Sequence, residues 1–340
     1  MKSLKITIKP ISSFVSRIQS DTFFGQFAWT YRELYGEEKL KADIIDKQPS
    51  IIFSDGFPAG YLPYPILKPL KENYFNNIIK EKSNWEQEAY IKEELKKKEF
   101  ISADLLEDIA ANIFSEALAD KVLLDKKDYN TEDKKEDFLI SEKVYKNSIN
   151  RYTGTTEIKG GLYGVLESFF DIEKKEEKRL IDIYMLYDSG LNIKLIKEAI
   201  MFIGINGFGK NKSTGKGRFE TPEYEEDPKG LNNNDPKKDY NGIISLSTAV
   251  LSGNLKVNYA KTFTKFPKHG GDLATSGKYI KKPAIFYKAG STFRLKKDNE
   301  TYNYGDNLKL FHPKYKGHIH NARMVPYYIK LKDSGVKENG

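Results

Sequence analysis

Residues 204–219 form a glycine-rich and strongly cationic stretch, GINGFGKNKSTGKGRF. Five glycines alternate with four Lys and Arg residues, and no carboxylate lies among them. Glycine allows a positive φ and a close approach of a ligand to the main chain, which exposes successive N–H donors, while Lys and Arg supply the charge that holds a phosphate. The stretch therefore predicts an anion-binding loop, and a polyanion is the expected partner.

The apolar residues before this loop recur at the three-to-four spacing of an amphipathic helix over 191–203. Residues 204–210 fit the pattern G-x-x-x-x-G-K, but a P-loop precedes its helix and carries Ser or Thr after the lysine, whereas Asn211 follows here. A nucleotide-hydrolysing P-loop protein is therefore disfavoured. A merely flexible bend is the other alternative, and it gives no reason for four cations without a counterion.

The composition narrows the class of protein. At 340 residues the chain is about twice the length of a typical domain, so two domains are expected. A net charge of +8 is moderately basic and suits a nucleic-acid partner, and 22 Tyr and 20 Phe residues provide rings for stacking. The absence of cysteine excludes disulfides, thiolate metal sites and cysteine nucleophiles. Because no apolar run approaches the roughly 18 residues of a membrane span, we expect a cytoplasmic protein with no membrane partner.

The first part of the sequence predicts one α+β unit over residues 1–144. Residues 4–10 alternate apolar and polar side chains as a half-buried strand does. Ser20, Asp21 and Thr22 supply N-cap oxygens for a helix that ends before Gly36. Short strands follow over 49–69. Two helices are expected in an insertion at about 84–124, and the charged residues at about 125–144 predict a mobile linker.

The second part, residues 145–332, repeats the order of strand and helix and includes the glycine-rich loop. The strands are expected at 161–170, 179–187, 243–250, 256–266, 283–287 and 325–331. A flexible tail is expected at 333–340. The predicted fold class is therefore α+β, with two ferredoxin-like (RRM-like) βαββαβ units that carry helical and loop insertions. Sheets of this kind commonly bind RNA.

Four short segments together resemble the repeat-associated mysterious protein (RAMP) superfamily, and within it the fourth subunit of type III-A CRISPR (Csm) effector complexes. Residues 20–25, SDTFFG, are similar to the S-D-T-L-F-G opening of that family's first helix, and residues 213–219, STGKGRF, to its glycine-rich signature. The other matches are NRYTG at 150–154, followed by GGLY at 160–163, and KHGG at 268–271, followed by KYIKKP at 278–283. The four matches extend over nearly the whole chain.

The resemblance implies a non-catalytic cap in a CRISPR antiviral defence complex. Such a subunit holds the 5′ repeat-derived handle of the crRNA and docks the large polymerase-like subunit. It also contacts the backbone RAMP subunits and meets target RNA only indirectly. It needs no metal ion and no cofactor. The equivalent subunit of a type III-B complex stays open as an alternative.

The predicted RNA contacts combine cations for the phosphates with hydroxyl, amide and glycine positions that approach the strand closely. Arg151 lies in a Gly/Thr-rich turn and is suited to pair bidentately with a phosphate, while Ser20 and Thr22 lie at a helix N-terminus, which favours an anion. Asp21 is interpreted as a capping carboxylate, and His269 as either an RNA contact or a surface residue. The predicted RNA-binding residues are Arg17, Ser20, Thr22, Asn150, Arg151, Gly207, Gly209, Lys210, Lys212, Ser213, Thr214, Gly215, Lys216, Gly217, Arg218, Lys268, His269, Gly270 and Gly271.

A metal-independent ribonuclease of the same superfamily, which processes CRISPR repeat RNA, is the main alternative. It needs a general base, most often His, near cations that stabilise the phosphorane. None of the four histidines lies on the predicted helix that begins near Thr22, where repeat-cleaving relatives tend to carry theirs. His318 and His320 have no evident third metal ligand and are interpreted as surface residues of a basic loop. The four histidines are His269, His312, His318 and His320.

Two further classes are weaker alternatives. A target-cleaving backbone subunit would use an aspartate in a glycine-containing loop, and Asp21 lies in no such loop. A general RNA-binding protein unconnected with CRISPR would show salt-dependent affinity for phosphates without a preference for a repeat handle. Sequence preference for the handle therefore separates this class from the complex subunit.

Overall fold

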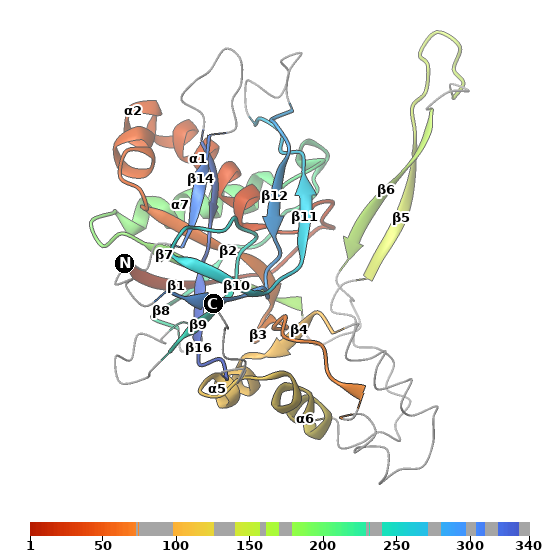
Figure 1. The fold of residues 1–340 in the computed structure, drawn as a ribbon. Helices are drawn as coiled ribbons and strands as arrows, with labels where there is room; N and C mark the ends of the chain where they lie inside the picture. The colour runs from red at the N-terminus through yellow and green to blue at the C-terminus, as the bar shows by residue number, and fades with distance from the viewer. Residues whose placement is uncertain are drawn as a thin grey trace.

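The structure is a computed structural model that describes residues 1–72, 74, 98–125, 140–156, 161–169, 179–228, 231, 240–270, 280–296, 304–309 and 319–332. Figure 1 shows two antiparallel sheets with helices on the outside and one hairpin that projects from the body. Across these ranges, no helix combines the length and the apolar character that crossing a membrane requires.

The first sheet has the strand order β2-β7-β1-β8. Its strands are β1 (Lys2–Ile8), β2 (Ile51–Pro58), β7 (Ile181–Tyr187) and β8 (Glu223–Glu226). Helices α1 (Ser20–Tyr35) and α7 (Ile193–Asn206) cover one face of this sheet, where Phe23 and Phe27 of α1 and Ile200 of α7 pack with Ile6 and Ile183 of the strands. This core explains the alternation in β1, because every second residue of a strand faces the same side. A short helix α2 (Glu37–Leu40) and a π-helical turn η1 (Lys41–Ile45) follow α1.

The second sheet has the order β10-β13-β9-β16. Its strands are β9 (Gly242–Ser245), β10 (Leu255–Tyr259), β13 (Thr292–Leu295) and β16 (Pro326–Ile329). Three strand pairs flank the two sheets, namely β3 (Tyr61–Pro63) with β4 (Phe100–Ser102), β11 (Thr262–Lys265) with β12 (Ala284–Tyr287), and β14 (Gly305–Leu308) with β15 (His320–Arg323). Helices α5 (Ala103–Ala110) and α6 (Ser115–Asp125) lie at the end of the molecule opposite to α1 and α2 (Figure 1).

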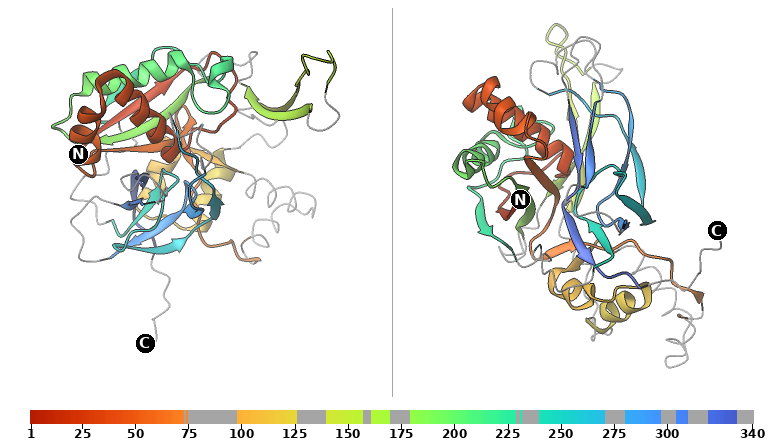
Figure 2. Two further views of the ribbon diagram at one scale, coloured as in Figure 1. Left: turned by 90° about the horizontal axis from the view of Figure 1, so that it is seen from above. Right: turned by 60° about the vertical axis from the view of Figure 1, so that its left-hand side comes forward.

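The two sheets share a hydrophobic core. Ile52 and Tyr184, on the face of the first sheet that α1 and α7 leave uncovered, pack with Ile244 and Tyr327 of the second sheet and with Leu106 of α5. Figure 2 shows α1 and α7 on the outer side of the first sheet, away from the second sheet. The two sheets therefore form one continuous body.

Strands β5 (Ile140–Asn147) and β6 (Leu162–Phe169) pair along their full length and extend away from the body in the views of Figures 1 and 2. The base of this hairpin is attached to the body through Phe14 and Ser168, which exchange two backbone hydrogen bonds of 3.0 and 2.8 Å. The opposite end, near residues 148–156, is therefore the part of the hairpin farthest from this attachment.

The predicted α+β class is confirmed, as are the helices at 20–35 and before the glycine-rich loop. The expected division at 144/145 does not coincide with the division between the sheets, because β7 inserts between β1 and β2. A local pattern carries no information on this pairing, since β7 follows β2 by more than a hundred residues. The predicted strand at 256–266 consists of two strands, β10 and β11, which belong to different sheets.

The predicted insertion and linker are described only in part. Of the helices expected at 84–124, residues 84–97 lie outside the described residues, and the remainder forms β4, α5 and α6. Residues 126–139 of the predicted linker and the predicted tail at 333–340 also lie outside the described residues. Residues 140–144 belong to β5 and therefore correct the expected end of the linker.

Candidate nucleic-acid interface

The glycine-rich loop begins where α7 ends and folds back onto that helix. Gly207, with φ +88°, ends the helix, and the N–H of Phe208 then donates to the carbonyl of Gly217 at 2.8 Å. Phe208 and Phe219 are 0% and 3% exposed, so two rings anchor the loop in the core below α7. The loop includes a short 3₁₀ turn, η3 (Lys212–Thr214), and leads into β8 without a further α-helix. The expected order of helix and then loop is confirmed.

Two glycines of the loop are needed for packing. A Cβ at Gly207 would lie 2.3 Å from the carbonyl oxygen of Lys216, and one at Gly217 would lie 2.1 Å from that of Phe208. Both residues also have positive φ, a region that favours glycine. By contrast, Gly215 has no neighbour within 4 Å of a Cβ position. The main chain therefore approaches itself at Gly207 and Gly217, and a residue with a Cβ at either position would displace the facing carbonyl.

The loop rests on residues 11–18 and on α1. The N–H of Gly217 donates to the carbonyl of Ser13, that of Arg218 to Ser12 Oγ, and that of Lys210 to Ser16 Oγ. The expectation that these amides are exposed donors for an anion is therefore corrected. They are satisfied within the protein, because the loop packs against a second segment rather than projecting into solvent.

The Lys216 ammonium has a counterion, contrary to the prediction from the loop sequence. Its Nζ lies 2.6 Å from Oε2 of Glu167 on β6, and Ser13 Oγ donates to the same oxygen at 2.7 Å. Lys146 Nζ lies 3.0 Å from Oε1 of Glu167, whose side chain is fully buried. Burial raises the pKa of the Glu167 carboxyl, but hydrogen bonds from Lys216, Ser13 and Lys146 outweigh burial and hold the pKa at about 2. Lys216 therefore fastens the loop to the base of the β5–β6 hairpin.

Three other cations of the region are exposed. Lys210, Lys212 and Arg218 lie on the solvent side of the loop, and Arg218 uses only its Nε to donate to the carbonyl of Ile205 at 3.1 Å. Arg17 follows Ser16 in the supporting segment and is also exposed, at 3.5 Å from a carboxylate oxygen of Glu99. The exposed residues Ser213, Thr214 and Gly215 lie between the loop cations in sequence. We call Arg17, Lys210, Lys212 and Arg218 the loop cations.

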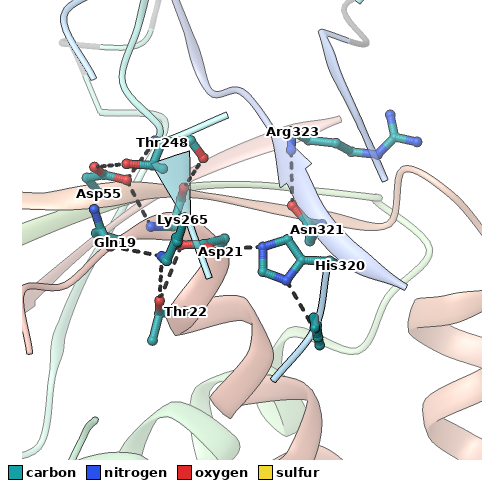
Figure 3. A network of polar contacts seen from close by, with 11 residues as sticks. Gln19, Asp21, Thr22, Asp55, Thr248, Lys265, His320, Asn321 and Arg323 are labelled. Carbon is teal, nitrogen blue, oxygen red and sulfur yellow. Dashed lines mark hydrogen bonds and ion pairs between the residues drawn. The ribbon is translucent and has the colours of Figure 1, made fainter. Parts of the chain in front are cut away.

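The N-terminus of α1 lies in a buried polar network (Figure 3). Asp55 of β2 accepts hydrogen bonds from the N–H groups of Ser20 and Thr248, both at 2.8 Å, and Ser20 Oγ donates to the carbonyl of Thr248. Asp55, which lies on β2, therefore caps the N-terminus of α1. The predicted role of Asp21 as the capping residue is wrong. Ser20 is 3% exposed and its polar groups already have partners in the chain.

Asp21 joins an ion pair and a histidine instead. Its Oδ1 lies 2.7 Å from Lys265 Nζ of β11, and its Oδ2 accepts from Nε2 of His320 of β15 at 2.9 Å (Figure 3). Burial raises the pKa of the Asp21 carboxyl, but the hydrogen bond from His320 and the charge of Lys265 outweigh burial and hold the pKa at about 2. Thr22 Oγ1 is half-buried and accepts from the same Lys265 Nζ at 3.1 Å.

His320 is 7% exposed and packs on the ring of Phe286, so its interpretation as a surface residue is wrong. Burial lowers the pKa of the imidazole below its usual value, which favours the neutral form. Lys281 Nζ lies 3.4 Å from the other ring nitrogen, Nδ1. His312 and His318 lie outside the described residues. Within the described ranges, no group of three or more acidic or histidine side chains converges as a metal site would require.

Stability is expected to fall in acid because of Asp21 and Glu167. Each has a folded-state pKa of about 2, below the ordinary values of 3.8 and 4.5, so the unfolded chain takes up these protons first. The stabilisation is therefore present above about pH 4.5 and is lost as pH falls toward 2. Urea unfolding at pH 7, 5, 4 and 3 measures this loss. A Glu167→Gln variant has a smaller loss, and a free energy of unfolding that stays constant from pH 5 to pH 3 would contradict the assignment.

The segment after β11 approaches α1 farther along that helix. A Cβ at Gly270 would lie 2.8 Å from Nε1 of Trp29, so the two residues are in close contact. Lys268 is exposed, whereas His269 is 4% exposed. His269 is therefore not a surface residue. Gly271 lies outside the described residues.

The structure separates Asn150 and Arg151 from the glycine-rich loop. Both lie in the turn at the far end of the β5–β6 hairpin, where Asn150 Oδ1 accepts from the N–H of Tyr152 at 2.9 Å. Glu167, which contacts Lys216, lies five residues along β6 from Leu162 at that end, or about 17 Å at strand geometry. The predicted residues therefore fall into two groups, one on the body and one at the end of the hairpin.

Sequence reasoning missed the exposed apolar side chains of the hairpin. Tyr152 is 100% exposed, and large apolar side chains project from both strands. The sequence GLYGVLESFF predicts a strand, yet a strand of this composition normally has a buried face. A large exposed apolar surface commonly marks a binding site. The exposed apolar residues of the hairpin are Tyr145, Ile149, Tyr152, Leu162, Tyr163 and Leu166.

Comparison with known proteins identifies similar folds. No protein-family model matches the sequence, and no curated protein matches it. The structure resembles Csm4 in a Csm3–Csm4 subcomplex of a type III-A CRISPR-Cas interference complex, with a TM-score of 0.57, 17% identity and coverage of 98% of this chain and 100% of that chain. It also resembles Csm4 in Csm1–Csm4 cassettes in complex with cA4 and with pppApA, with TM-scores of 0.56 and 0.55, 14% identity and the same coverage. At these identities the likeness is one of fold, and it extends over nearly the whole chain.

Proposed function

We propose that this chain is the subunit of a type III-A CRISPR effector (Csm) complex that binds the 5′ repeat-derived handle of the crRNA. In this role it is a non-catalytic cytoplasmic component of antiviral defence. The observation that carries the proposal is a glycine-rich loop that is hydrogen-bonded to Ser12 and Ser16 and has Lys210, Lys212 and Arg218 exposed to solvent. Arg17 follows Ser16 and is also exposed. The likeness in fold to Csm4 supports the same role.

We infer a ferredoxin-like unit in the first sheet. The chain order β1-α1-β2-β7-α7-β8 and the sheet order β2-β7-β1-β8 support this assignment, with α1 and α7 on one face. This unit draws on residues 2–58 and 181–226, and the insertion between β2 and β7 supplies the hairpin and helices α5 and α6. The second sheet, together with its flanking pairs, is the more divergent unit. In each unit the loops beside the sheet are the expected RNA contacts.

The loop cations are proposed to bind the phosphates of the handle. Neutralising a phosphate releases counterions, so exposed cations without a carboxylate partner contribute most to affinity. Lys210, Lys212 and Arg218 are therefore expected to contribute more than Arg17, which lies near Glu99. Ser213, Thr214 and Gly215 are proposed to contact the strand between these charges. Lys216, Gly207, Gly209 and Gly217 instead hold the loop in shape, as their internal contacts support. Ser20 and His269 are buried, and Gly270 packs on Trp29.

Arg151, Asn150 and the exposed rings near them are proposed to contact RNA from the hairpin. Aromatic side chains stack on unpaired bases of any sequence, and Tyr152 is fully exposed at the end of the hairpin. The same hairpin stands away from the body, so it can reach a strand whose other end lies on the loop cations. Lys268 extends the contact on the body.

The burial of the two histidines in the described part of the chain favours a scaffold over a ribonuclease. A general base must reach the 2′-hydroxyl of the substrate, whereas His320 is buried against Asp21 and His269 is 4% exposed. Incubation of labelled CRISPR repeat RNA with the protein discriminates the two roles, because specific cleavage would support the ribonuclease.

The partners of the similar structures suggest partners for this chain. The solved relatives include Csm1–Csm4 and Csm3–Csm4 assemblies. We propose that this chain likewise docks a large polymerase-like subunit and a backbone RAMP subunit, and meets target RNA only through the assembled complex.

Isolation of the protein from its native host at mild salt tests the proposal. The RNA that co-purifies is sequenced from its 5′ end, and co-purifying proteins are identified. We expect crRNAs that share one repeat-derived handle, together with other RAMP subunits. A protein that carries no RNA, or RNA of mixed 5′ sequence, would contradict the proposal and favour a general RNA-binding role.

A further inference from the structure

The paired strands β11 and β12 have one packed face and one exposed face. Phe263 and Phe286 lie opposite each other in register, and Phe286 is 0% exposed, as expected for the packed side. Thr264 and Ile285 lie opposite each other at the next position, where Ile285 is 65% exposed. Phe266, one residue beyond β11, is 62% exposed. An exposed apolar strip therefore follows the outer face of this pair.

Lysines flank both ends of the strip. At one end the N–H of Lys288 donates to the carbonyl of Lys261, which places these two exposed residues side by side. At the other end Lys268 pairs with Ile280 in an isolated bridge, and the exposed Lys282 is two residues farther along. Ile280 is 50% exposed and continues the apolar strip. The arrangement is a row of exposed apolar side chains with two lysines at each end.

The positive charge around β11 and β12 favours RNA over a protein as the partner of this face. Residues 261–268 and 280–288 contain four exposed lysines and no carboxylate, and the lysines are Lys261, Lys268, Lys282 and Lys288. Lysine is depleted at protein–protein interfaces, whereas a basic groove lined with aromatic side chains is typical of single-stranded nucleic-acid binding. A protein partner would need a concentrated acidic surface, while RNA carries one negative charge per nucleotide.

We propose that the outer face of β11 and β12 is a stacking platform for single-stranded RNA. Bases stack on Phe266 and pack on Ile285 and Ile280, while the lysines at both ends bind the flanking phosphates. The platform rests on the proposed RNA-binding function. It extends that function from Lys268 and the KYIKKP segment at 278–283 to Phe266, Ile285 and Lys288, which lie outside the motifs of the sequence. The contacts are independent of base identity, because every base has a face that stacks.

Substitutions of Phe266 test the platform. The probe is a 5′-fluorescein-labelled, 20-nucleotide single-stranded RNA of mixed sequence, titrated with the full chain and followed by anisotropy. Phe266→Ala and Phe266→Leu are expected to weaken binding roughly 5- to 100-fold, whereas Phe266→Tyr keeps the ring and binds as the wild type does. Val257→Ala, at an exposed apolar residue of β10 in the second sheet, is the matched control and is expected to leave affinity unchanged.

A thiol introduced on the strip gives a second readout. The chain has no cysteine, so Ile285→Cys contains a single reactive group. Saturating RNA is expected to slow its alkylation by N-ethylmaleimide at least several-fold, whereas Lys47→Cys, near the end of η1, reacts at the same rate with and without RNA. Wild-type affinity in Phe266→Ala and Phe266→Leu, together with unprotected Ile285→Cys, would overturn the platform.

The outcomes separate this proposal from the proposed function. If replacing Lys210, Lys212 and Arg218 together by alanine weakens RNA binding while the Phe266 variants bind as the wild type does, the platform is wrong and the function stands. If Phe266 variants keep RNA but no longer co-purify with other subunits, the face is a protein interface and the platform is overturned. If the wild-type chain binds no RNA, both proposals fail.

Discussion

Replacing Lys210, Lys212 and Arg218 together by alanine is expected to weaken RNA binding by about 100-fold at physiological salt. In the proposed complex each cation forms a charge-assisted hydrogen bond to a phosphate, worth on the order of 1 kcal/mol net. None of the three is paired with a carboxylate in the part of the chain that the structure describes. Loss of three phosphate contacts also lowers the dependence of log K on log salt by about 2, at roughly 0.7 per contact. Anisotropy titrations at several salt concentrations measure both quantities.

The control is a variant with the same change in net charge, made at Lys194 at the start of α7, Lys2 at the start of β1 and Lys47 after η1. Lys2, Lys47 and Lys194 are exposed, and Lys194 lies in the first turn of the 14-residue helix whose far end carries the loop, about 20 Å away. Their triple alanine variant is expected to keep nearly full affinity. Equal losses in both variants would mean that net charge, rather than the loop, determines binding. Both variants are expected to have the same free energy of unfolding as the wild type, since exposed cations contribute little to stability.

Lys216→Met is expected to lower the free energy of unfolding by about 2–4 kcal/mol. The substitution keeps most of the apolar stem but leaves the buried carboxylate of Glu167 with Lys146 and Ser13 as its remaining partners. Removing one partner of a buried ion pair leaves charge that is incompletely compensated, which is strongly destabilising. Urea unfolding of the folded protein at pH 7 measures the change.

Lys212→Met is the matched control for that experiment. Lys212 lies in the same loop but is exposed, so its variant is expected to stay within about 0.5 kcal/mol of the wild type. The double variant Lys216→Met with Glu167→Gln is expected to recover part of the loss, because it also removes the buried charge. A single Lys216→Met variant as stable as the wild type would show that the ion pair does not fasten the loop.

The sequence predicted the helices whose signals lie within the helix itself. The helical spacing of Phe23, Phe27 and Tyr31 predicted α1, and Gly36 marked its end, because an amphipathic face and a C-terminal glycine are local signals. The position of the glycine-rich loop after α7 followed in the same way. The α+β class also followed from the order of these elements.

The contacts that define the site could not be predicted because they join distant residues. Lys216 and Glu167 are separated by 49 positions, and Asp21 and His320 by 299. The sequence does not show which charged residues contact each other. It therefore cannot distinguish Lys216 from the three exposed cations of the loop, because Glu167 approaches Lys216 only in the folded structure. Asp21 likewise has the sequence context of a cap, and only the position of Asp55 on β2 assigns that role elsewhere.

Because β7 lies between β1 and β2, the first sheet cannot complete its fold until β7 has been synthesised. During synthesis β1 and β2 leave the ribosome long before residues 181–187, which separate them in the finished sheet. Pairings so distant along the chain raise the contact order and slow folding, because a long loop must close before the contact forms. The edges of β1 and β2 thus remain open until β7 arrives. A polypeptide that stops before residue 181 lacks the strand that joins them, so the first sheet becomes complete only late in translation.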